Sequence, residues 1–363
     1  MLQEVESILE FWYSKGVYGF RCDVINEIYK TSLADGKGTR LNRYRGGEHY
    51  FNQEGNHKIL QKLRKEVFSK HDTMVVGECP NSTLDDARKF TTEELDMVFA
   101  FEHQDSPTYK LRPWKFRPFD AERWKRIFIR WQESSVWNAV YLENHDQLRS
   151  IDHFGEREYW KECGKLYATL LLTLKGTPFI FEGEEIGMLD YDHYDLSKSR
   201  DIVVDNVKRI LDPLPLTKKT KENIISHYCR DHERMPMRFD SGKNYGFSSS
   251  DQTWLPVTDE HPNINVRSEE NDPESILNYY KSLLRFRKQS QALRGERITF
   301  IEKGKGVLAY YREEENEKLL IILNLNNHIV NGNFENESVL FFNYSERDEM
   351  HLEPYECRVI KVN

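Results

Sequence analysis

The chain has 363 residues, of which 38% are hydrophobic and 13% aromatic, enough for one large domain with a small one or for two of medium size. Its net charge is −8 with acidic and basic residues interspersed, so it has no basic face and nucleic acid is excluded as an expected partner. No run of 18 apolar residues occurs, so we expect no segment that spans a membrane.

The first part of the chain alternates helical patterns with short apolar runs. An amphipathic helix is predicted over residues 1–16, without the basic region and cleavage site of a signal peptide. Five strands are predicted at 18–25, 72–78, 95–102, 138–143 and 176–182. Helical stretches at 56–70, 120–133 and 157–175 separate them. This alternation is typical of βαβ units with a parallel sheet.

The second part of the chain has a different pattern. Residues 190–265 are polar with few periodic signals, so we expect loops and short helices there, followed by a helix at 274–289. Short alternating strands are then predicted at 296–300, 305–311, 318–325, 338–342 and 355–362. We therefore predict an α/β domain over residues 1–292 and a small antiparallel β-sandwich domain over residues 293–363.

The cysteines bear on the compartment. There are five of them, Cys22, Cys79, Cys163, Cys229 and Cys357, which is an odd number at wide spacing. No CxxC pair occurs, so the sequence indicates neither a disulfide framework nor a zinc site, and we expect no metal. A reducing, cytoplasmic setting fits this cysteine usage.

Three predicted strands end in a carboxylate, namely Asp23, Glu78 and Asp146. In a barrel of parallel strands, functional residues gather at this edge because the βα loops open there. A retaining glycosidase needs one carboxylate as nucleophile and a second as proton donor. Glu78 follows the more apolar strand, which favours a protonated donor, whereas Arg21 shares the face of Asp23 and favours an ionised nucleophile.

Each of these residues also has a purely structural explanation. A single acidic residue at a strand end is usually the N-cap of the next helix. Arg21 and Asp23 would form an ion pair without any catalytic role, and His145 would be a surface or capping histidine. Three acids in such contexts are harder to explain in this way. The sequences around them distinguish the structural explanation from the catalytic one.

Several segments resemble the later signature motifs of the α-amylase superfamily of glycoside hydrolases (glycoside hydrolase family 13). In chain order they are GFRCDVI, VVGECP, ENHDQ and GTPFIFEGEEIGM. The oligo-1,6-glucosidase and α-glucosidase branch is the most similar, because RDHERMPMRFD at 230–240 resembles its RDxARTPMQW segment. FEH at 101–103 and WQ at 131–132 match that branch too. The resemblance covers essentially the whole chain.

The resemblance implies roles for particular residues. Asp23 would be the nucleophile that forms a glucosyl-enzyme, and Glu78 the acid/base. Asp146 would bind sugar hydroxyls and stabilise the transition state.

Further residues would bind the substrate. Arg21 would orient the nucleophile, and His145 would bind a hydroxyl of the glucose. At least one of Arg230 and Arg234 would reach the same pocket. Val24 is the residue type that this branch carries when α-1,6 linkages are preferred.

The implied reaction is retaining hydrolysis of terminal α-1,6, or α-1,4, glucosidic bonds in short oligosaccharides such as isomaltose, without a cofactor. Alternatives within the family are trehalose-6-phosphate hydrolases and glucosyl-transferring enzymes of the sucrose isomerase type, which share the three acids. A non-catalytic relative and a truncated, inactive fragment are alternatives of another class.

The largest departure from the family is the position of the nucleophile at residue 23. In the family it ends the fourth barrel strand, so we expect an incomplete (β/α)₈ TIM barrel with strands four to eight. Five strands cannot close such a barrel, and an open sheet exposes unpaired edges. We therefore expect that the chain is poorly stable alone or needs a complementary N-terminal fragment. The RDxARTPMQW segment also departs from the family, at Glu233, Met235, Arg238 and Phe239.

Overall fold

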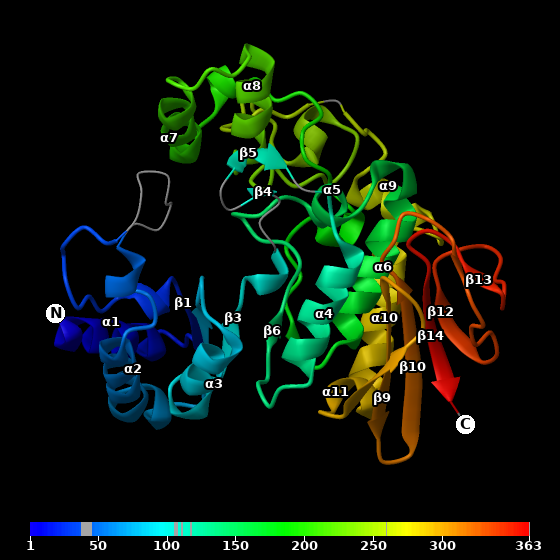
Figure 1. Cartoon of the computed structure of the whole chain (residues 1–363), viewed down its shortest axis with the longest axis horizontal. Coiled ribbons are helices and arrows are strands. Elements are labelled where there is room, and N and C mark those ends of the chain that lie inside the picture. The colour runs from blue at the N-terminus through cyan, green and yellow to red at the C-terminus, as the bar shows by residue number, and fades with distance from the viewer. Residues whose placement is uncertain (38–45, 105–107, 110–111, 117, 259, 363) are drawn as a thin grey trace. The chain divides into compact units, whose positions relative to one another are not determined.

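The computed structural model describes residues 1–37, 46–104, 108–109, 112–116, 118–258 and 260–362 (Figure 1). The chain divides into two compact units. Unit 1 comprises Met1–Asp105, Arg126–Val140 and Lys175–Thr177. Unit 2 comprises Ser106–Lys125, Tyr141–Leu174 and Pro178–Asn363. The predicted domain boundary at residue 292 falls within unit 2.

Unit 1 contains a parallel sheet of three strands in the order β1 (Gly19–Cys22), β2 (Met74–Glu78) and β3 (Met97–Phe99). Its helices are α1 (Leu2–Ser14), α2 (Glu54–Glu66), α3 (Leu84–Glu93) and the C-terminal part of α4 (Ala121–Gln132). Strand and helix side chains share one apolar core, with members such as Leu60, Val75, Phe90, Val98 and Trp131. The predicted parallel βα pattern is confirmed for these strands.

Local sequence explains how β2 presents its last residue. Gly77 lies where a Cβ atom would come within 2.5 Å of Leu95 Cδ1, so only glycine fits this tightly packed position. Helix α3 then begins at a capping box, in which Thr83 and Asp86 bind each other's backbone N–H groups. The segment between β2 and α3 is therefore fixed at both ends.

The next two predicted strands are shorter than expected. β6 (Ala139–Val140) and β7 (Thr177–Pro178) form a separate two-stranded sheet, so the strands predicted at 138–143 and 176–182 are correct in position and too long. Pro178 has no N–H to donate to a sheet, which limits β7. After β6, a turn begins in which the backbone N–H of Asp146 donates to Asn144 Oδ1 at 2.8 Å. Asp146 therefore lies in a loop, six residues beyond the end of β6.

Unit 2 contains the remaining helices. They are α5 (Ser150–Phe154), α6 (Trp160–Thr173), α7 (Ile202–Leu211), α8 (Lys218–His227), α9 (Val266–Asn271), α10 (Ile276–Gln289) and α11 (Gln291–Arg294). β4 (Thr108–Tyr109) and β5 (Arg112–Phe116) pair with each other. A small core that includes Val204, Leu211 and Ile224 joins α7 to α8. The short helices expected within 190–265 are thus present.

The C-terminal part of unit 2 is antiparallel. A five-stranded sheet has the order β12-β14-β10-β9-β8, and β9, β10 and β14 lie side by side in Figure 1. These strands are β8 (Ile298–Glu302), β9 (Val307–Glu314), β10 (Glu317–Asn324), β12 (Val339–Phe342) and β14 (Cys357–Val362). Two short strands, β11 (Val330–Asn331) and β13 (His351–Leu352), pair with each other, and their Val330 and Leu352 pack on the same core as β9, β10 and β14. The predicted antiparallel C-terminal sheet is confirmed.

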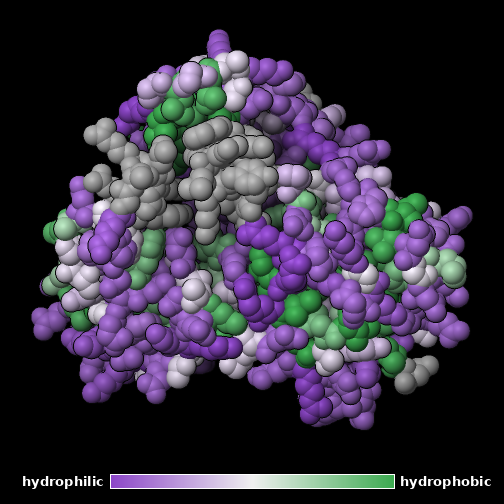
Figure 2. Space-filling model, in the orientation of Figure 1, coloured by the Kyte–Doolittle hydropathy of each residue, from purple (hydrophilic) through white to green (hydrophobic). Residues whose placement is uncertain are grey.

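One face of the molecule is mainly polar. Hydrophilic residues cover most of the face shown in Figure 2, with smaller hydrophobic patches between them. Among the residues that the structure describes, no helix has both the length and the apolar character needed to cross a bilayer.

Candidate active site

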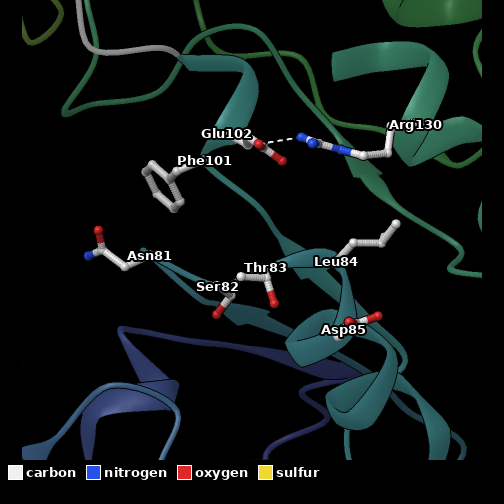
Figure 3. A pocket seen from close by; sticks show the side chains of 8 residues that line it. All are labelled: Asn81, Ser82, Thr83, Leu84, Asp85, Phe101, Glu102 and Arg130. Carbon is white, nitrogen blue, oxygen red and sulfur yellow. Dashed lines mark ion pairs between the residues drawn. The ribbon is translucent and has the colours of Figure 1, made fainter. Parts of the chain in front are cut away.

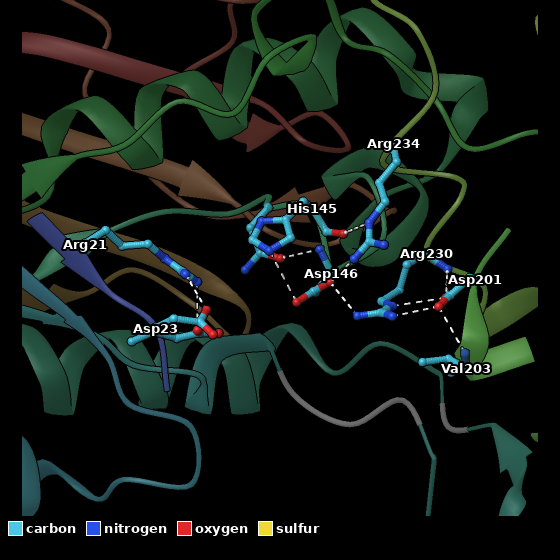
Figure 4. A network of polar contacts seen from close by, with 10 residues as sticks. Arg21, Asp23, His145, Asp146, Asp201, Val203, Arg230 and Arg234 are labelled. Carbon is cyan, nitrogen blue, oxygen red and sulfur yellow. Dashed lines mark hydrogen bonds and ion pairs between the residues drawn. The ribbon is translucent and has the colours of Figure 1, made fainter. Parts of the chain in front are cut away.

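Two carboxylates of unit 1 bind the same guanidinium. Asp23 follows β1 directly, and Glu78 is the last residue of the neighbouring strand β2. Arg21 Nη1 donates to Asp23 Oδ1 at 2.5 Å (Figure 4), and its Nη2 donates to Glu78 Oε2 at 2.7 Å. Because β1 and β2 are parallel, both acids reach the same edge of the sheet. The structure therefore brings Arg21, Asp23 and Glu78 together.

The two acids have different environments. The side chain of Asp23 is 72% exposed, whereas that of Glu78 is 11% exposed. Burial raises the pKa of Glu78, and a hydrogen bond with Asp23 raises it further, against the opposing effects of Arg21 and of the Val24 N–H group. A carboxyl group with a raised pKa holds its proton toward neutral pH, as a general acid requires.

The residue after Asp23 has a strained backbone. Val24 adopts φ 42° and ψ 42°, a left-handed conformation that is rare for a β-branched residue. Its N–H donates to Glu78 Oε2 at 3.2 Å. Such outliers are found preferentially at functional sites, where surrounding contacts hold them in place.

Asn26 supports the loops around these acids, and the sequence analysis did not select it. Its buried Nδ2 donates to Pro80 O and to Asn52 Oδ1, both at 2.8 Å. The loops after β1 and β2 are thereby joined. The available signal was an asparagine three residues after Asp23 that interrupts an apolar run.

A cavity of about 560 Å³ lies in unit 1, beside the segments that follow β2 and β3 (Figure 3). It is lined by Asn81, Ser82, Thr83, Leu84, Asp85, Phe101, Glu102 and Arg130. Arg130 forms an ion pair with Glu102, whose Oε2 also accepts a hydrogen bond from Trp131 Nε1 at 2.8 Å. The FEH motif therefore lines this cavity and contacts the WQ motif through Glu102 and Trp131. The cavity combines an aromatic ring with hydroxyl, amide and charged groups.

A second cluster, in unit 2, surrounds Asp146 (Figure 4). Asp146 Oδ1 accepts hydrogen bonds from Arg230 Nη1 at 2.9 Å and from Arg234 Nη2 at 2.5 Å. Arg234 Nε donates to the backbone oxygen of His145 at 2.9 Å, and His145 Nε2 lies 3.5 Å from Asp146 Oδ2. The structure thus brings all four predicted residues of this region together.

Asp201 fixes Arg230 in this cluster and is a site residue that the sequence analysis missed. Arg230 Nη2 donates to Asp201 Oδ1 at 2.7 Å, and Arg230 Nε donates to Oδ2 at 3.0 Å. Asp201 also caps α7 by accepting from the Val203 N–H group at 3.0 Å. Burial alone would raise the pKa of Asp201, but its hydrogen bonds from Arg230 and Val203 leave that pKa below its usual range. The hydrogen bonds with Asp201 raise the pKa of Arg230, and the charge of Asp146 raises it further.

Glu233 lies in sequence between the two arginines and is 2% exposed. Its Oε2 atom has no hydrogen-bond partner among the described residues. Burial raises the pKa of Glu233 to about 8, and Asp146 adds to this shift, while Arg149 and Arg234 oppose it. Arg149 also holds the segment, since its Nη2 donates to the backbone oxygen of Glu233 at 3.2 Å.

The eight predicted site residues thus form two clusters. Arg21, Asp23, Val24 and Glu78 belong to unit 1, whereas His145, Asp146, Arg230 and Arg234 belong to unit 2. Within the described parts of the chain, no group of three or more His, Cys, Asp and Glu side chains is arranged to hold a metal ion.

Residues 1–296 match the family described as alpha amylase, catalytic domain. The chain belongs to this family. Two similar relatives are oligo-1,6-glucosidases. That of Parageobacillus thermoglucosidasius is 35% identical over 390 residues, covering 99% of this chain and 68% of the relative, and that of Heyndrickxia coagulans is 36% identical, covering 98% and 67%. The family match and these relatives identify the chain as a glycoside hydrolase.

Solved structures of the family have the same fold. The trehalose-6-phosphate hydrolase of Bacillus licheniformis superposes with a TM-score of 0.87 at 31% identity, covering 99% of this chain and 67% of the hydrolase. A trehalulose synthase superposes with a TM-score of 0.90 at 27% identity, covering 99% and 68%. The chain spans about two thirds of the length of these relatives.

Proposed function

We propose that this family member is a retaining α-glucosidase that hydrolyses terminal α-1,6 glucosidic bonds of short, isomaltose-like oligosaccharides, with α-1,4 bonds as a second linkage. The observation that carries the proposal is the shared contact of Asp23 and Glu78 with Arg21. It sets an exposed carboxylate beside a buried carboxyl with a raised pKa, the pair that a retaining mechanism uses.

In the proposed mechanism, Asp23 attacks the anomeric carbon while Glu78 gives its proton to the departing glycosidic oxygen. The resulting glucosyl ester on Asp23 is then hydrolysed by water, whose proton returns to Glu78. Arg21 orients Asp23 during both steps. No step uses a metal or an organic cofactor.

The unit 2 cluster has the chemistry to bind glucose hydroxyls. Asp146 accepts hydrogen bonds and the arginines Arg230 and Arg234 donate them, and the ring of His145 adds a further polar group. We assign these residues to substrate binding, with Asp146 also stabilising the transition state. We assign Val24 to linkage choice, because the resemblance links a valine at this position to α-1,6 bonds.

We further propose that β1, β2, β3, β6 and β7 correspond to strands four to eight of a (β/α)₈ barrel. The parallel order β1-β2-β3 and the coverage of two thirds of each relative support this correspondence. Residues 1–292 would form the partial barrel and residues 293–363 the β domain, with a complementary N-terminal fragment as partner. We also propose a cytoplasmic location, which the cysteine usage of the sequence favours.

Two other substrates deserve the same assay. Trehalose 6-phosphate is included because a trehalose-6-phosphate hydrolase from Bacillus subtilis is 31% identical over 331 residues. Sucrose is included because a trehalulose synthase shares the fold. If either compound is turned over in preference to isomaltose, it replaces isomaltose as the proposed substrate. The roles proposed for the three acids stay the same.

The test is hydrolysis of p-nitrophenyl α-glucoside and isomaltose by purified protein, with the first product followed by proton NMR. We expect α-glucose to form first, since a double displacement retains the configuration. Asp23→Asn should abolish turnover, whereas Asp72→Asn, at an acid outside the cluster, should not. Activity that survives in Asp23→Asn would refute the assignment, and a wild-type chain without activity would favour the inactive-fragment alternative.

A further inference from the structure

Another cavity, of about 660 Å³, lies in unit 2. Its walls come from the beginning of α6, from the segment that leads into α9, and from α9 itself. None of the lining residues belongs to the cluster around Asp146. The volume lies within the range of about 300–1,000 Å³ that is usual for small-molecule sites.

Four of the lining side chains are apolar, namely Trp160, Leu189, Pro262 and Ile264. The indole N–H group of Trp160 donates to the backbone oxygen of Gly187 at 2.7 Å. Gly187 adopts φ 60°, and a Cβ atom there would come within 2.8 Å of Trp160 Nε1. The indole can lie in this place because residue 187 has no side chain. The aromatic ring is therefore already fixed in position at the cavity.

His261 forms a strained part of the wall. Its φ of 54° lies in the left-handed region, which residues other than glycine rarely adopt. The backbone oxygen of His261 accepts hydrogen bonds from Arg238 Nη1 at 3.1 Å and from the Ile264 N–H group at 3.0 Å. Its ring atom Nε2 lies 3.1 Å from Asp192 Oδ2. Strained residues that their surroundings hold in this way are found preferentially at functional sites.

The charged side chains of this cavity already have partners. Lys161 Nζ donates to Asp272 Oδ2 at 2.6 Å, and Arg157 Nε donates to Asp152 Oδ1 at 2.5 Å. Burial raises the pKa of Glu269, which favours its uncharged form. A charged ligand would have to separate these pairs, so the cavity favours a neutral one.

We propose that this cavity, called the Trp160 cavity below, is a non-catalytic binding site for a neutral saccharide. A sugar ring presents C–H groups on its faces, which can pack on the indole of Trp160. Hydroxyl groups around the edge of the sugar can bind the polar side chains of the lining, among them Asn263 and Ser268. The site uses none of the residues assigned to catalysis, so it goes beyond the proposed function.

The lining disfavours two other classes of ligand. A purely apolar ligand, such as an acyl chain, would cover the polar side chains of the lining without giving them hydrogen bonds. A phosphate ester would need cations, but carboxylates already bind both Arg157 and Lys161. A neutral ligand with many hydroxyl groups meets neither cost.

The experiment follows Trp160 directly. The chain is labelled with 5-fluorotryptophan, and Trp160→Phe identifies the ¹⁹F resonance of Trp160 among those of the seven tryptophans. Isomaltose is added to the Asp23→Asn protein, in which we expect no hydrolysis of the probe. The Trp160 resonance should shift in a saturable way. Glucose 6-phosphate at the same concentrations should bind more weakly.

Two asparagine variants locate the contact. Asn263→Ala should weaken the binding of isomaltose by about 3- to 10-fold, the effect of losing one hydrogen bond. Asn271→Ala is the matched control, because Asn271 lies on α9 outside the lining of the cavity and should leave the affinity unchanged. Both asparagines are exposed, so circular dichroism melts should show that both variants keep the fold.

The outcomes separate this site from the proposed function. A saturable shift that Asn263→Ala weakens and Asn271→Ala does not, and that persists in Asp146→Asn, supports the Trp160 cavity. If the chain binds isomaltose there and the wild type does not hydrolyse it, the result counts against the proposed function alone. A shift without saturation would overturn the inference. So would a shift that is lost in Asp146→Asn or unchanged in Asn263→Ala, or tighter binding of glucose 6-phosphate.

Discussion

A buried carboxyl group should make the stability of this protein pH-dependent, and Glu233 is such a group, with its Oε2 atom unpaired among the described residues. It is 2% exposed, and burial raises its pKa from the ordinary value of 4.5 to about 8. The test perturbation is Glu233→Gln, which keeps the shape of the side chain and removes its titration. Glu233→Ala, which installs the alanine of the RDxARTPMQW segment, is the second variant.

The size of the effect follows from the two pKa values of Glu233. In the unfolded chain Glu233 ionises near pH 4.5, whereas in the folded chain it keeps its proton until about pH 8. Between these values unfolding releases a proton, so the free energy of unfolding falls as the pH rises. At ~1.4 kcal/mol per pKa unit, the loss approaches roughly 4 kcal/mol at pH 8 and then levels off. This is a large share of a typical total of about 5–15 kcal/mol.

Neighbouring charged groups affect how steeply the free energy of unfolding falls with pH, but not the direction of the change. Asp146 raises the pKa of Glu233, while Arg149 and Arg234 lower it. The pKa of buried Asp190 is also raised, and Glu233 contributes to that shift. Removing the Glu233 charge should therefore reduce the pH dependence that comes from both acids.

The assay is urea unfolding of the wild-type protein and the variants at several pH values from 4.5 to 8.5. The wild-type free energy of unfolding should fall across this range more steeply than that of either variant. Glu158→Gln, at an exposed carboxyl group of the same unit, should keep the wild-type slope. Equal slopes for the wild type and Glu233→Gln would show that Glu233 is ionised in the folded protein and would refute the reasoning.

Three further substitutions have defined outcomes. Arg230→Met leaves the buried Asp201 without its cation and should lower the free energy of unfolding by about 3 kcal/mol in urea titrations. Gly77→Ala forces a Cβ atom to within 2.5 Å of a leucine methyl group and should cost about 1–3 kcal/mol, measured in the same way. Arg21→Ala removes the cation that holds down the pKa of Glu78, so carboxyl ¹³C NMR should find Glu78 titrating at higher pH than in the wild type.

The sequence predicted the strand ends that carry Asp23 and Glu78 because apolar runs and the order of strands can be read from the local sequence. An apolar run identifies a strand, and parallel strands place their last residues at one edge. The contact of Arg21 with Asp23 followed from alternation along the same strand, and the structure contains it. Its second contact, with Glu78, joins residues 57 positions apart and needed the pairing of β1 with β2.

Asp201 and Asn26 were not predictable in this way. Asp201 lies in a polar segment without periodicity, and its role depends on Arg230, which is 29 residues away. Asn26 binds the backbone of Pro80 across 54 residues. The length of β6 was overestimated because an apolar run continues past the point where the hydrogen-bonded pairing ends. These features depend on tertiary contacts that local pattern does not encode.

The carboxylate of Asp201 connects the beginning of α7 to the cluster around Asp146, because it accepts from the Val203 N–H group and from Arg230. Opening of the first turn of α7 therefore also releases the arginine that contacts Asp146. Local unfolding of α7 and disassembly of the Asp146 cluster therefore occur together in this part of unit 2. A sugar that binds Asp146 and Arg230 should consequently slow hydrogen exchange at the Val203 amide, although Val203 itself lies outside the cluster. The rate of exchange at this single amide would report how long the cluster around Asp146 stays assembled.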